Sequence, residues 1–257
     1  MEAARRAGEI ILHAERPDEE VFSKSGRANF VTAYDRKVQE FLIGELKKIF
    51  PQAHFVGEEE DLENFAAGYD KGYTFVIDPI DGTTNFMKGY SLSVISIALL
   101  LDGASHVGVV YNPYTDQMFH AVKGCGAFEN GVRIKSSGEP LERSLVGLGS
   151  APYYEEAVTR RAFEIGHWYM RRSLDIRRTG SAAYDLCLVA SGKEGLYFEP
   201  VLSLWDYAAG ALIVEEAGGR VTDLKGNTLA MRGKSSVCAA SRGVAGGDYL
   251  PPEELRM

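Results

Sequence analysis

The secondary structure that the sequence predicts changes near Gly138, and this change constrains the fold most. Before it, apolar segments over residues 54–56, 73–77, 106–111 and 117–122 indicate strands, with Asn112-Pro113 as a turn and Asn130-Gly131 as a hairpin signal. After it, strands predicted over residues 145–148, 176–178, 195–198 and 237–240 alternate with helices. Helices are predicted over residues 2–15, 35–50, 153–170, 182–190 and 206–217. We therefore expect an α+β fold, with an antiparallel-rich lobe (1–137) and an α/β lobe (138–257) forming one compact unit.

Charge and apolar patterning exclude several classes of protein. The formal net charge of −8 argues against general binding of nucleic acid or anionic lipid. The longest apolar stretch, residues 94–101, is too short to cross a bilayer, and the N-terminus lacks the apolar run of a secretory signal. The three cysteines show no Cys-x-x-Cys pair, so we expect reduced, mostly buried thiols in a cytoplasmic protein.

Three acidic motifs stand next to predicted strands or open a predicted helix. They are Gly57-Glu58-Glu59-Glu60, Asp78-Pro79-Ile80-Asp81-Gly82-Thr83-Thr84-Asn85-Phe86, and Trp205-Asp206. Hard divalent cations prefer carboxylate and carbonyl oxygens, which these motifs supply. If the carboxylates converge, bare neighbours about 4 Å apart repel by roughly 4 kcal/mol at an effective dielectric near 20, so a cation would be needed.

The central motif also carries groups suited to phosphate. Pro79 holds Asp78 in an extended conformation, and the Ile80 carbonyl lies between the two aspartates. Gly82 permits an unusual turn or a close backbone approach. Hydroxyls and backbone amides follow at Thr83-Thr84-Asn85, where a helix could begin and bind phosphate.

Other interpretations of these motifs remain open. Glutamate runs are usually solvated, Asp-Gly is usually a turn, and Asp206 alone would serve as a helix N-cap. An EF-hand loop is excluded because Thr83 occupies the position of its required glycine. A haloacid-dehalogenase-like phosphatase is disfavoured because two residues, not one, separate Asp78 from Asp81.

At these residues the chain resembles the inositol monophosphatase family. The resemblance rests on the three acidic motifs, the last of them extended as Trp205-Asp206-Tyr207-Ala208-Ala209-Gly210 and continuing to Glu216-Ala217-Gly218-Gly219. Val31-Thr32-Ala33-Tyr34-Asp35 and Gly180-Ser181-Ala182-Ala183 support it, so it covers almost the whole chain. The chain begins almost inside the first helix, and the segment between Glu60 and Tyr73 is compact.

The resemblance implies a layered α-β-α-β-α sandwich, two or three Mg²⁺ ions, sensitivity to Li⁺ and a homodimer. It implies that Glu58, Asp78, Asp81, Asp206 and the Ile80 carbonyl bind metal. It implies that Thr83, Asp35 and Glu59 act in catalysis. Substrate contacts are implied for Gly82, Thr83, Gly180, Ser181, Ala182 and Glu199, although Ser181 alone would pass as an N-cap and Glu199 as a loop acid.

The expected activity is Mg²⁺-dependent hydrolysis of a small phosphomonoester by metal-activated water, with inositol 1-phosphate favoured. Fructose 1,6-bisphosphate, adenosine 3′,5′-bisphosphate, histidinol phosphate and NADP remain alternatives within the fold. Arg171-Arg172 and Arg177-Arg178 are interpreted as surface charges, with a site for a second phosphate as the other possibility. A regulatory binding protein on a phosphatase scaffold is the rival from another class.

Overall fold

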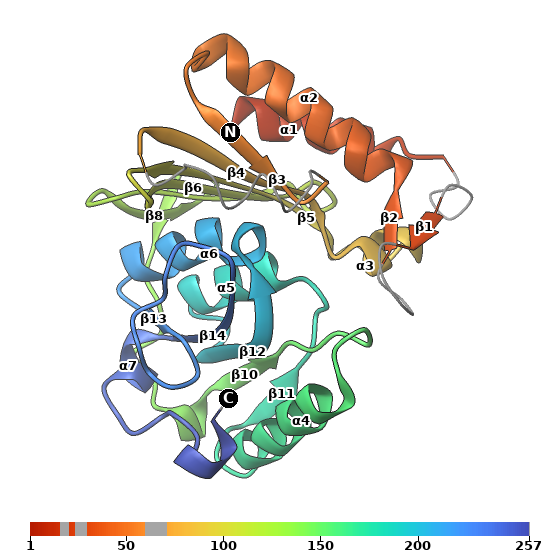
Figure 1. Cartoon of the computed structure of the whole chain (residues 1–257). Coiled ribbons are helices and arrows are strands. Elements are labelled where there is room, and N and C mark those ends of the chain that lie inside the picture. Colours follow the sequence, from red (N-terminus) through yellow and green to blue (C-terminus); the bar gives the residue numbers. More distant parts are fainter. Residues whose placement is uncertain (16–20, 24–29, 60–70, 257) are drawn as a thin grey trace.

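The computed structural model describes residues 1–15, 21–23, 30–59 and 71–256. Helices and sheets alternate in five layers, α-β-α-β-α, as expected (Figure 1). Glu60 of the first acidic motif, and most of the segment that follows it, lie outside the described residues.

The first two layers are a helix pair and a seven-stranded sheet. Helices α1 (Glu2–Leu12) and α2 (Ala33–Ile49) cover the outer face of the sheet, and a small two-stranded sheet, β1 (Val21–Ser23) with β2 (Phe30–Thr32), precedes α2 (Figure 1). The large sheet has the order β3-β4-β5-β6-β7-β8-β9, antiparallel except for the parallel β3–β4 pair. Its strands are β3 (His54–Gly57), β4 (Tyr73–Asp81), β5 (Val94–Leu101), β6 (Ala104–Asn112), β7 (Gln117–Val122), β8 (Gly126–Glu129) and β9 (Val132–Ile134). The hairpin predicted at Asn130-Gly131 is confirmed, because both residues have positive φ between β8 and β9.

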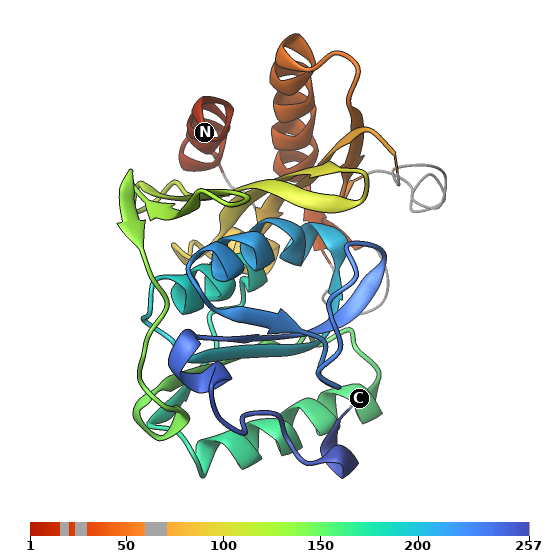
Figure 2. The same ribbon diagram turned by 90° about the vertical axis from the view of Figure 1, so that its left-hand side faces the viewer.

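The third layer is a pair of buried helices, α5 (Ala182–Ala190) and α6 (Leu204–Glu216), which lies between the two sheets (Figure 2). The fourth layer is a five-stranded sheet of order β11-β10-β12-β14-β13, and α4 (Glu156–Met170) covers its outer face. Its strands are β10 (Leu145–Leu148), β11 (Asp175–Arg177), β12 (Leu196–Ser203), β13 (Arg220–Thr222) and β14 (Lys234–Ala240). The short elements are α3 (Thr83–Met87), α7 (Arg242–Ala245) and the 3₁₀ turns η2 (Leu141–Arg143) and η3 (Glu253–Leu255).

Several predicted helix boundaries were wrong, and side-chain capping explains most of them. The helix predicted from Asp35 begins at Ala33, because Thr32 and Asp35 form a capping box. The helix predicted from Asp206 begins at Leu204, because Ser203 is its N-cap and Asp206 its third residue. The helix predicted from Tyr153 begins only at Glu156, which leaves Tyr153 and Tyr154 in the preceding loop.

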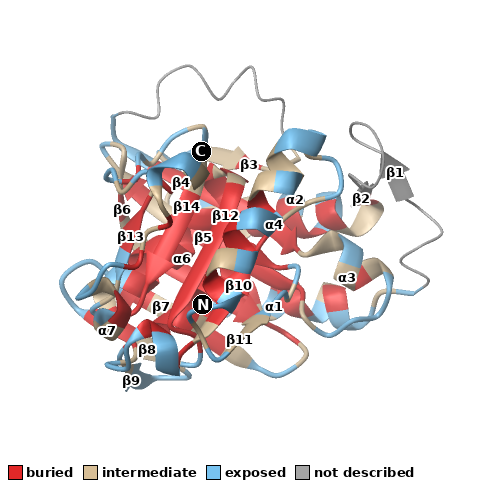
Figure 3. Ribbon diagram, turned by 90° about the horizontal axis from the view of Figure 1, so that it is seen from below, coloured by how far each residue is buried: buried red, intermediate tan, exposed pale blue. Residues whose placement is uncertain are grey.

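The apolar core is continuous through the middle layer, which is buried in Figure 3. One cluster combines Val76 and Phe119 of the first sheet with Tyr197 and Val237 of the second. Residue 137 lies between the strands of the two sheets, but because they share this cluster the division into lobes stays a prediction.

Hydrogen bonds fix α6 against the first sheet. The Ser96 hydroxyl donates to the carbonyl of Trp205 at 3.2 Å, and the Ser105 hydroxyl donates to that of Ala208 at 3.1 Å. The backbones also touch: a Cβ at Gly108 would stand 2.6 Å from the carbonyl oxygen of Ala209. Gly108 is therefore required for this helix to lie so close to β6.

The cysteine prediction holds in part. All three thiols are free, with Cys187 and Cys238 buried, but Cys125 is exposed beside the β7–β8 turn. Within the described ranges no helix combines the length and apolarity needed to cross a bilayer.

We predict that Gly108→Ala destabilises the fold by about 1–3 kcal/mol, because the added methyl group must push α6 away from β6. Gly44→Ala is the matched control, since Gly44 lies in α2 with open space around it and alanine favours the helix by about 0.5–1 kcal/mol. Denaturant unfolding of both variants measures the difference. Equal stability of the two variants would contradict the close approach.

Candidate metal and phosphate site

One pocket between the two halves of the chain gathers most of the predicted site residues. Its walls come from the ends of β3 and β4, from α3, from the starts of α5 and α6, and from the loop before α4 (Figure 1). The predicted residues in its lining are Glu58, Asp78, Ile80, Asp81, Gly82, Thr83, Gly180, Ser181, Ala182, Glu199 and Asp206. Asp35 and Glu59 are absent from the lining: Asp35 lies directly behind Thr83, and the Glu59 amide donates to Gln39.

Strand β4 carries two of the acids, and hydrogen bonds fix their direction. The pairing of β4 with β5 is interrupted between Asp78 and Asp81, where Pro79 cannot donate a hydrogen bond. The amide of Ile80 donates to Oδ1 of Asp78 at 3.1 Å. Oδ2 of Asp81 accepts from the Ser181 hydroxyl and from the Ala183 amide, both at 2.7 Å. Asp81 therefore joins β4 to the start of α5, a hundred residues later in the chain.

Gly82 allows the chain to turn from β4 into α3. Its φ of +90° lies in the left-handed region, and a Cβ there would stand 3.2 Å from the carbonyl oxygen of Gly180. The next residue, Thr83, places its hydroxyl 3.2 Å from Oδ1 of Asp35 and 3.2 Å from the carbonyl of Ile80. The hydroxyl has one hydrogen, so it donates to one of these acceptors at a time.

Asp35 and Asp206 each have a second task at the start of a helix. Oδ2 of Asp35 accepts from the amide of Thr32 at 2.8 Å, and Oδ2 of Asp206 accepts from the amide of Ser203 at 2.6 Å. Both are the third residue of a capping box, so the helix start itself fixes each carboxylate. This local fold places Asp206 in the pocket opposite the acids of β4.

The acids raise one another's pKa. Asp78 is only 2% exposed, and its pKa lies well above the usual range because of burial and then because of Glu58, Asp81 and Asp206. Burial followed by Asp81 and Glu58 likewise raises the pKa of Asp206, and burial raises that of Asp81 to about 6. Such a cluster stays ionised at neutral pH only when a positive charge joins it.

The donor set fits a hard divalent cation. The pocket brings together four carboxylates and lies against Ile80, whose carbonyl was expected to join them, and hard cations take oxygen ligands of these kinds. No group of three His, Cys, Asp or Glu side chains in the described ranges forms a ready-made cage. The electrostatic coupling shows nevertheless that the four acids are neighbours, so the site offers the right donors without a closed cage.

Glu199 occupies another part of the pocket, held between two tyrosines. Its Oε1 accepts from the Tyr154 hydroxyl at 2.8 Å and its Oε2 from the Tyr197 hydroxyl at 2.5 Å. Burial raises the pKa of Glu199 to about 7, and both tyrosine hydrogen bonds oppose this rise. A Cβ at Gly149 would stand 2.2 Å from Oε2, so only glycine leaves room for the carboxylate in this position.

The sequence analysis missed some residues of this pocket. Tyr153 and Tyr154 were assigned to a helix, and their only local signal is Pro152 directly before them, which favours a loop. Arg178 was interpreted as a surface charge, yet it lines the pocket, and its guanidinium donates to the carbonyl of Ser150. Asn85 joins α3 to the segment before α5 through a 2.8 Å hydrogen bond to the carbonyl of Thr179.

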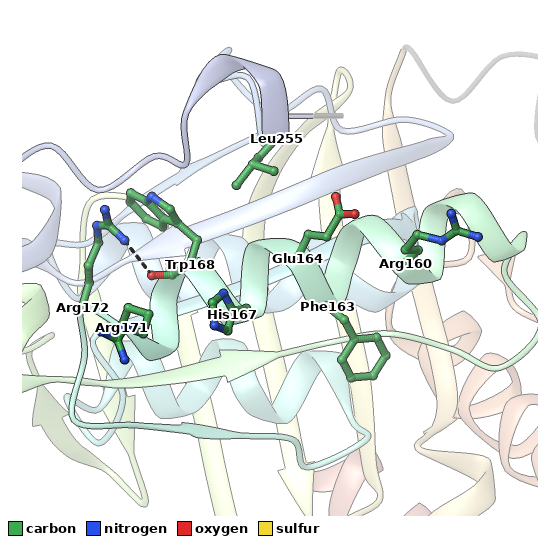
Figure 4. A pocket seen from close by; sticks show the side chains of 8 residues that line it. All are labelled: Arg160, Phe163, Glu164, His167, Trp168, Arg171, Arg172 and Leu255. Carbon is green, nitrogen blue, oxygen red and sulfur yellow. Dashed lines mark hydrogen bonds between the residues drawn. The ribbon is translucent and has the colours of Figure 1, made fainter.

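A second hollow on the outer face of α4 lacks such chemistry (Figure 4). Its acid, Glu164, pairs with Arg161 at 3.0 Å. Arg172 stacks 4.2 Å above the Trp168 ring and donates to the Trp168 carbonyl. Arg171 and Arg172 line this hollow and not the acidic pocket, so they are surface charges as interpreted.

Two further acids are buried behind the pocket. Asp185 of α5 and Glu194, which follows α5, are 1% and 2% exposed. Burial and then Glu194 raise the pKa of Asp185 well above its usual range, and burial raises that of Glu194 to about 8. Oδ1 of Asp185 and Oε2 of Glu194 have no hydrogen-bond partner among the described residues. At least one of these two carboxyl groups is therefore protonated at neutral pH.

The five layers and the shared acidic pocket define a family that comparison with known proteins identifies. The chain belongs to the inositol monophosphatase family, whose sequence profile matches residues 1–251. It is 36% identical to the Nus factor SuhB of Vibrio cholerae serotype O1 over 245 residues, 94% of this chain and 90% of that protein. Among solved structures, the extragenic suppressor protein SuhB from Bartonella henselae is 35% identical with a TM-score of 0.84, covering 94% of this chain and 92% of that one. The Thermotoga maritima IMPase is 30% identical with a TM-score of 0.85, covering 97% and 92%.

We predict that Glu194→Gln stabilises the protein increasingly as the pH rises from 5 to 8. The folded pKa of Glu194 lies above its unfolded value, so the wild type loses stability as the pH rises from about 4.5 through about 8. Glutamine has no proton to lose, and the gain at pH 8 should be about 1–3 kcal/mol. Unfolding free energies measured across this pH range test the trend. Glu253→Gln, an exposed control, should change stability by less than about 0.5 kcal/mol, and a gain for Glu194→Gln that is independent of pH would contradict the burial argument.

Proposed function

We propose that the protein is a Mg²⁺-dependent phosphatase of small phosphomonoesters. The observation that carries the proposal is the burial of Asp78, Asp81 and Asp206 in one pocket, with the pKa of each raised by burial and by the neighbouring acids. Buried carboxylates that destabilise one another need a reason to stand together, and cation binding supplies it. The general Mg²⁺ dependence of the family supports the same conclusion.

The residues that would hold Mg²⁺ are Glu58, Asp78, Asp81, Asp206 and the carbonyl of Ile80. When bound, the ions would polarise the phosphate and lower the pKa of the attacking water. Thr83, backed by Asp35, would orient that water through its hydroxyl. Backbone amides at Gly82 and Thr83 would bind phosphate oxygens beside it. Glu59 would act beside the metal site, although its side chain is not among the lining residues.

Inositol 1-phosphate is the favoured substrate. Glu199 places a hydrogen-bond acceptor in the pocket, as a polyol requires, while Gly180, Ser181 and Ala182 form the adjoining wall. A solved Staphylococcus aureus relative, SaIMPase-II, 28% identical with a TM-score of 0.80, holds inositol monophosphate, and the same protein has been solved with 2′-AMP. Fructose 1,6-bisphosphate, adenosine 3′,5′-bisphosphate, histidinol phosphate and NADP remain candidates. Family membership also favours inhibition by Li⁺ and a homodimer.

A regulatory binding protein is the second candidate. It is favoured by the similarity to proteins named Nus factor SuhB, which reach 39% identity over 227 residues in Escherichia coli K12. A purely regulatory protein would be free to lose Asp81, Thr83 or Asp206, yet all three are present and line one pocket. The intact site therefore favours catalysis.

We predict Mg²⁺-dependent phosphate release, abolished by EDTA and highest with inositol 1-phosphate in a panel of the five candidate esters. Asp81→Asn should lower kcat/KM by about three orders of magnitude, because it removes a charged ligand whose effect on the transition state is several kcal/mol. Asp248→Asn, an exposed control without a described hydrogen bond, should retain activity. Circular dichroism checks that both variants are folded.

The outcomes separate the candidates. Another preferred ester would leave the chemistry intact and replace only the substrate. Full activity in Asp81→Asn would refute the proposed site. If the folded, Mg²⁺-bound wild type releases no phosphate from any ester, the regulatory role is supported instead.

A further inference from the structure

The loop before α4 is fastened to the pocket at three places. The Gly149 amide donates to the carbonyl of Phe198 at 2.9 Å, and Arg178 donates to the carbonyl of Ser150. At the end of the loop, the Tyr154 hydroxyl lies within hydrogen-bond reach of both Glu199 and the carbonyl of Val201. The loop is therefore a fixed wall of the pocket and not a detached lid.

Tyr154 forms one half of a clamp around Glu199. The Tyr154 and Tyr197 hydroxyls meet different oxygens of the carboxylate, so rotation of the group about its last bond would break both contacts. Gly149 closes a third side, since even a methyl group there would collide with Oε2. Each carboxylate oxygen has more than one acceptor direction, so both can still accept hydrogen bonds from a ligand.

We propose that Tyr154 is a specificity-determining positioning residue, which holds Glu199 so that the pocket selects phosphomonoesters whose alcohol part carries further hydroxyl groups. The inference rests on the proposed phosphatase function and refines its substrate class. Tyr154 acts through Glu199 and not on the phosphate, because the metal-binding acids belong to the other walls of the pocket. Removing its hydroxyl frees Glu199 to rotate and weakens hydroxyl recognition while the phosphate end is unchanged.

The electrostatic surroundings of Glu199 agree with this role. Beyond the two tyrosines, the charged groups that act on it are Asp81 and Arg178, and Glu199 in turn acts on Asp206 and Asp185. Arg178 and the tyrosine hydrogen bonds favour the ionised form, which burial and Asp81 oppose. An ionised carboxylate is the stronger acceptor for substrate hydroxyls.

The test compares inositol 1-phosphate with cyclohexyl phosphate, which has the same ring size but no other hydroxyl group. The ratio of their kcat/KM values should fall about tenfold in Tyr154→Phe, mainly through KM for inositol 1-phosphate. Tyr184→Phe is the matched control: it removes a tyrosine hydroxyl that bonds Gln117 at 3.0 Å, outside the pocket, and should leave the ratio within about twofold. Gly149→Ala is the second test variant, because it displaces Glu199 by direct contact and should lower the same ratio.

A fall in the ratio in both Tyr154→Phe and Gly149→Ala supports the proposal. An unchanged ratio in folded Tyr154→Phe, or an equal loss for both esters, overturns it and indicates a purely structural tyrosine. If the wild type hydrolyses both esters without preferring the hydroxylated one, the subsite is also refuted while the phosphatase function stands. If the wild type hydrolyses neither ester, the proposed function fails first, and this inference fails with it.

Discussion

Mutual repulsion among buried carboxylates is the constraint on which the rest of the structure depends. Asp78, Asp81 and Asp206 are each held by hydrogen bonds from backbone amides, and Asp81 also by Ser181. These bonds stabilise the ionised forms but do not cancel the burial, since the pKa of every one of the three stays raised. The fold thus keeps an unfavourable arrangement that only a bound cation relieves, a cost expected at a functional site and not in an ordinary core.

The middle layer makes this arrangement possible. Both sheets pack on α5 and α6, and the starts of these helices face the pocket beside the end of β4. Serine hydroxyls on β5 and β6 bond to carbonyls of α6, and Gly108 allows the backbones to touch. Because packing of this density leaves little freedom, ligands from the two halves of the chain are held at a fixed separation.

The sequence predicted the features that depend on short segments. The alternation of elements, the Asn130-Gly131 hairpin and the turn at Gly82 all follow from local pattern and backbone preference, and the structure contains them. The acidic motifs pointed to a shared site because their residue types suit one chemistry, although convergence itself depends on tertiary packing. What no local pattern contains is the contact between Tyr154 and Glu199, which are 45 residues apart. The helix boundaries failed for a related reason: Ser203 caps α6 through contacts that residue types alone rank no higher than those of Asp206.

The capping box at the start of α6 gives Asp206 a double duty that Asp81 lacks. Its carboxylate is at once a candidate metal ligand and the group that satisfies the amide of Ser203 at the entrance of the most buried helix. Natural variation at position 206 is therefore restricted twice, and a substitution there mixes fraying of the helix with loss of the ligand. A loss of function caused at Asp206 cannot be assigned to chemistry alone, whereas the same loss at Asp81 can be traced to the site and its contact with α5.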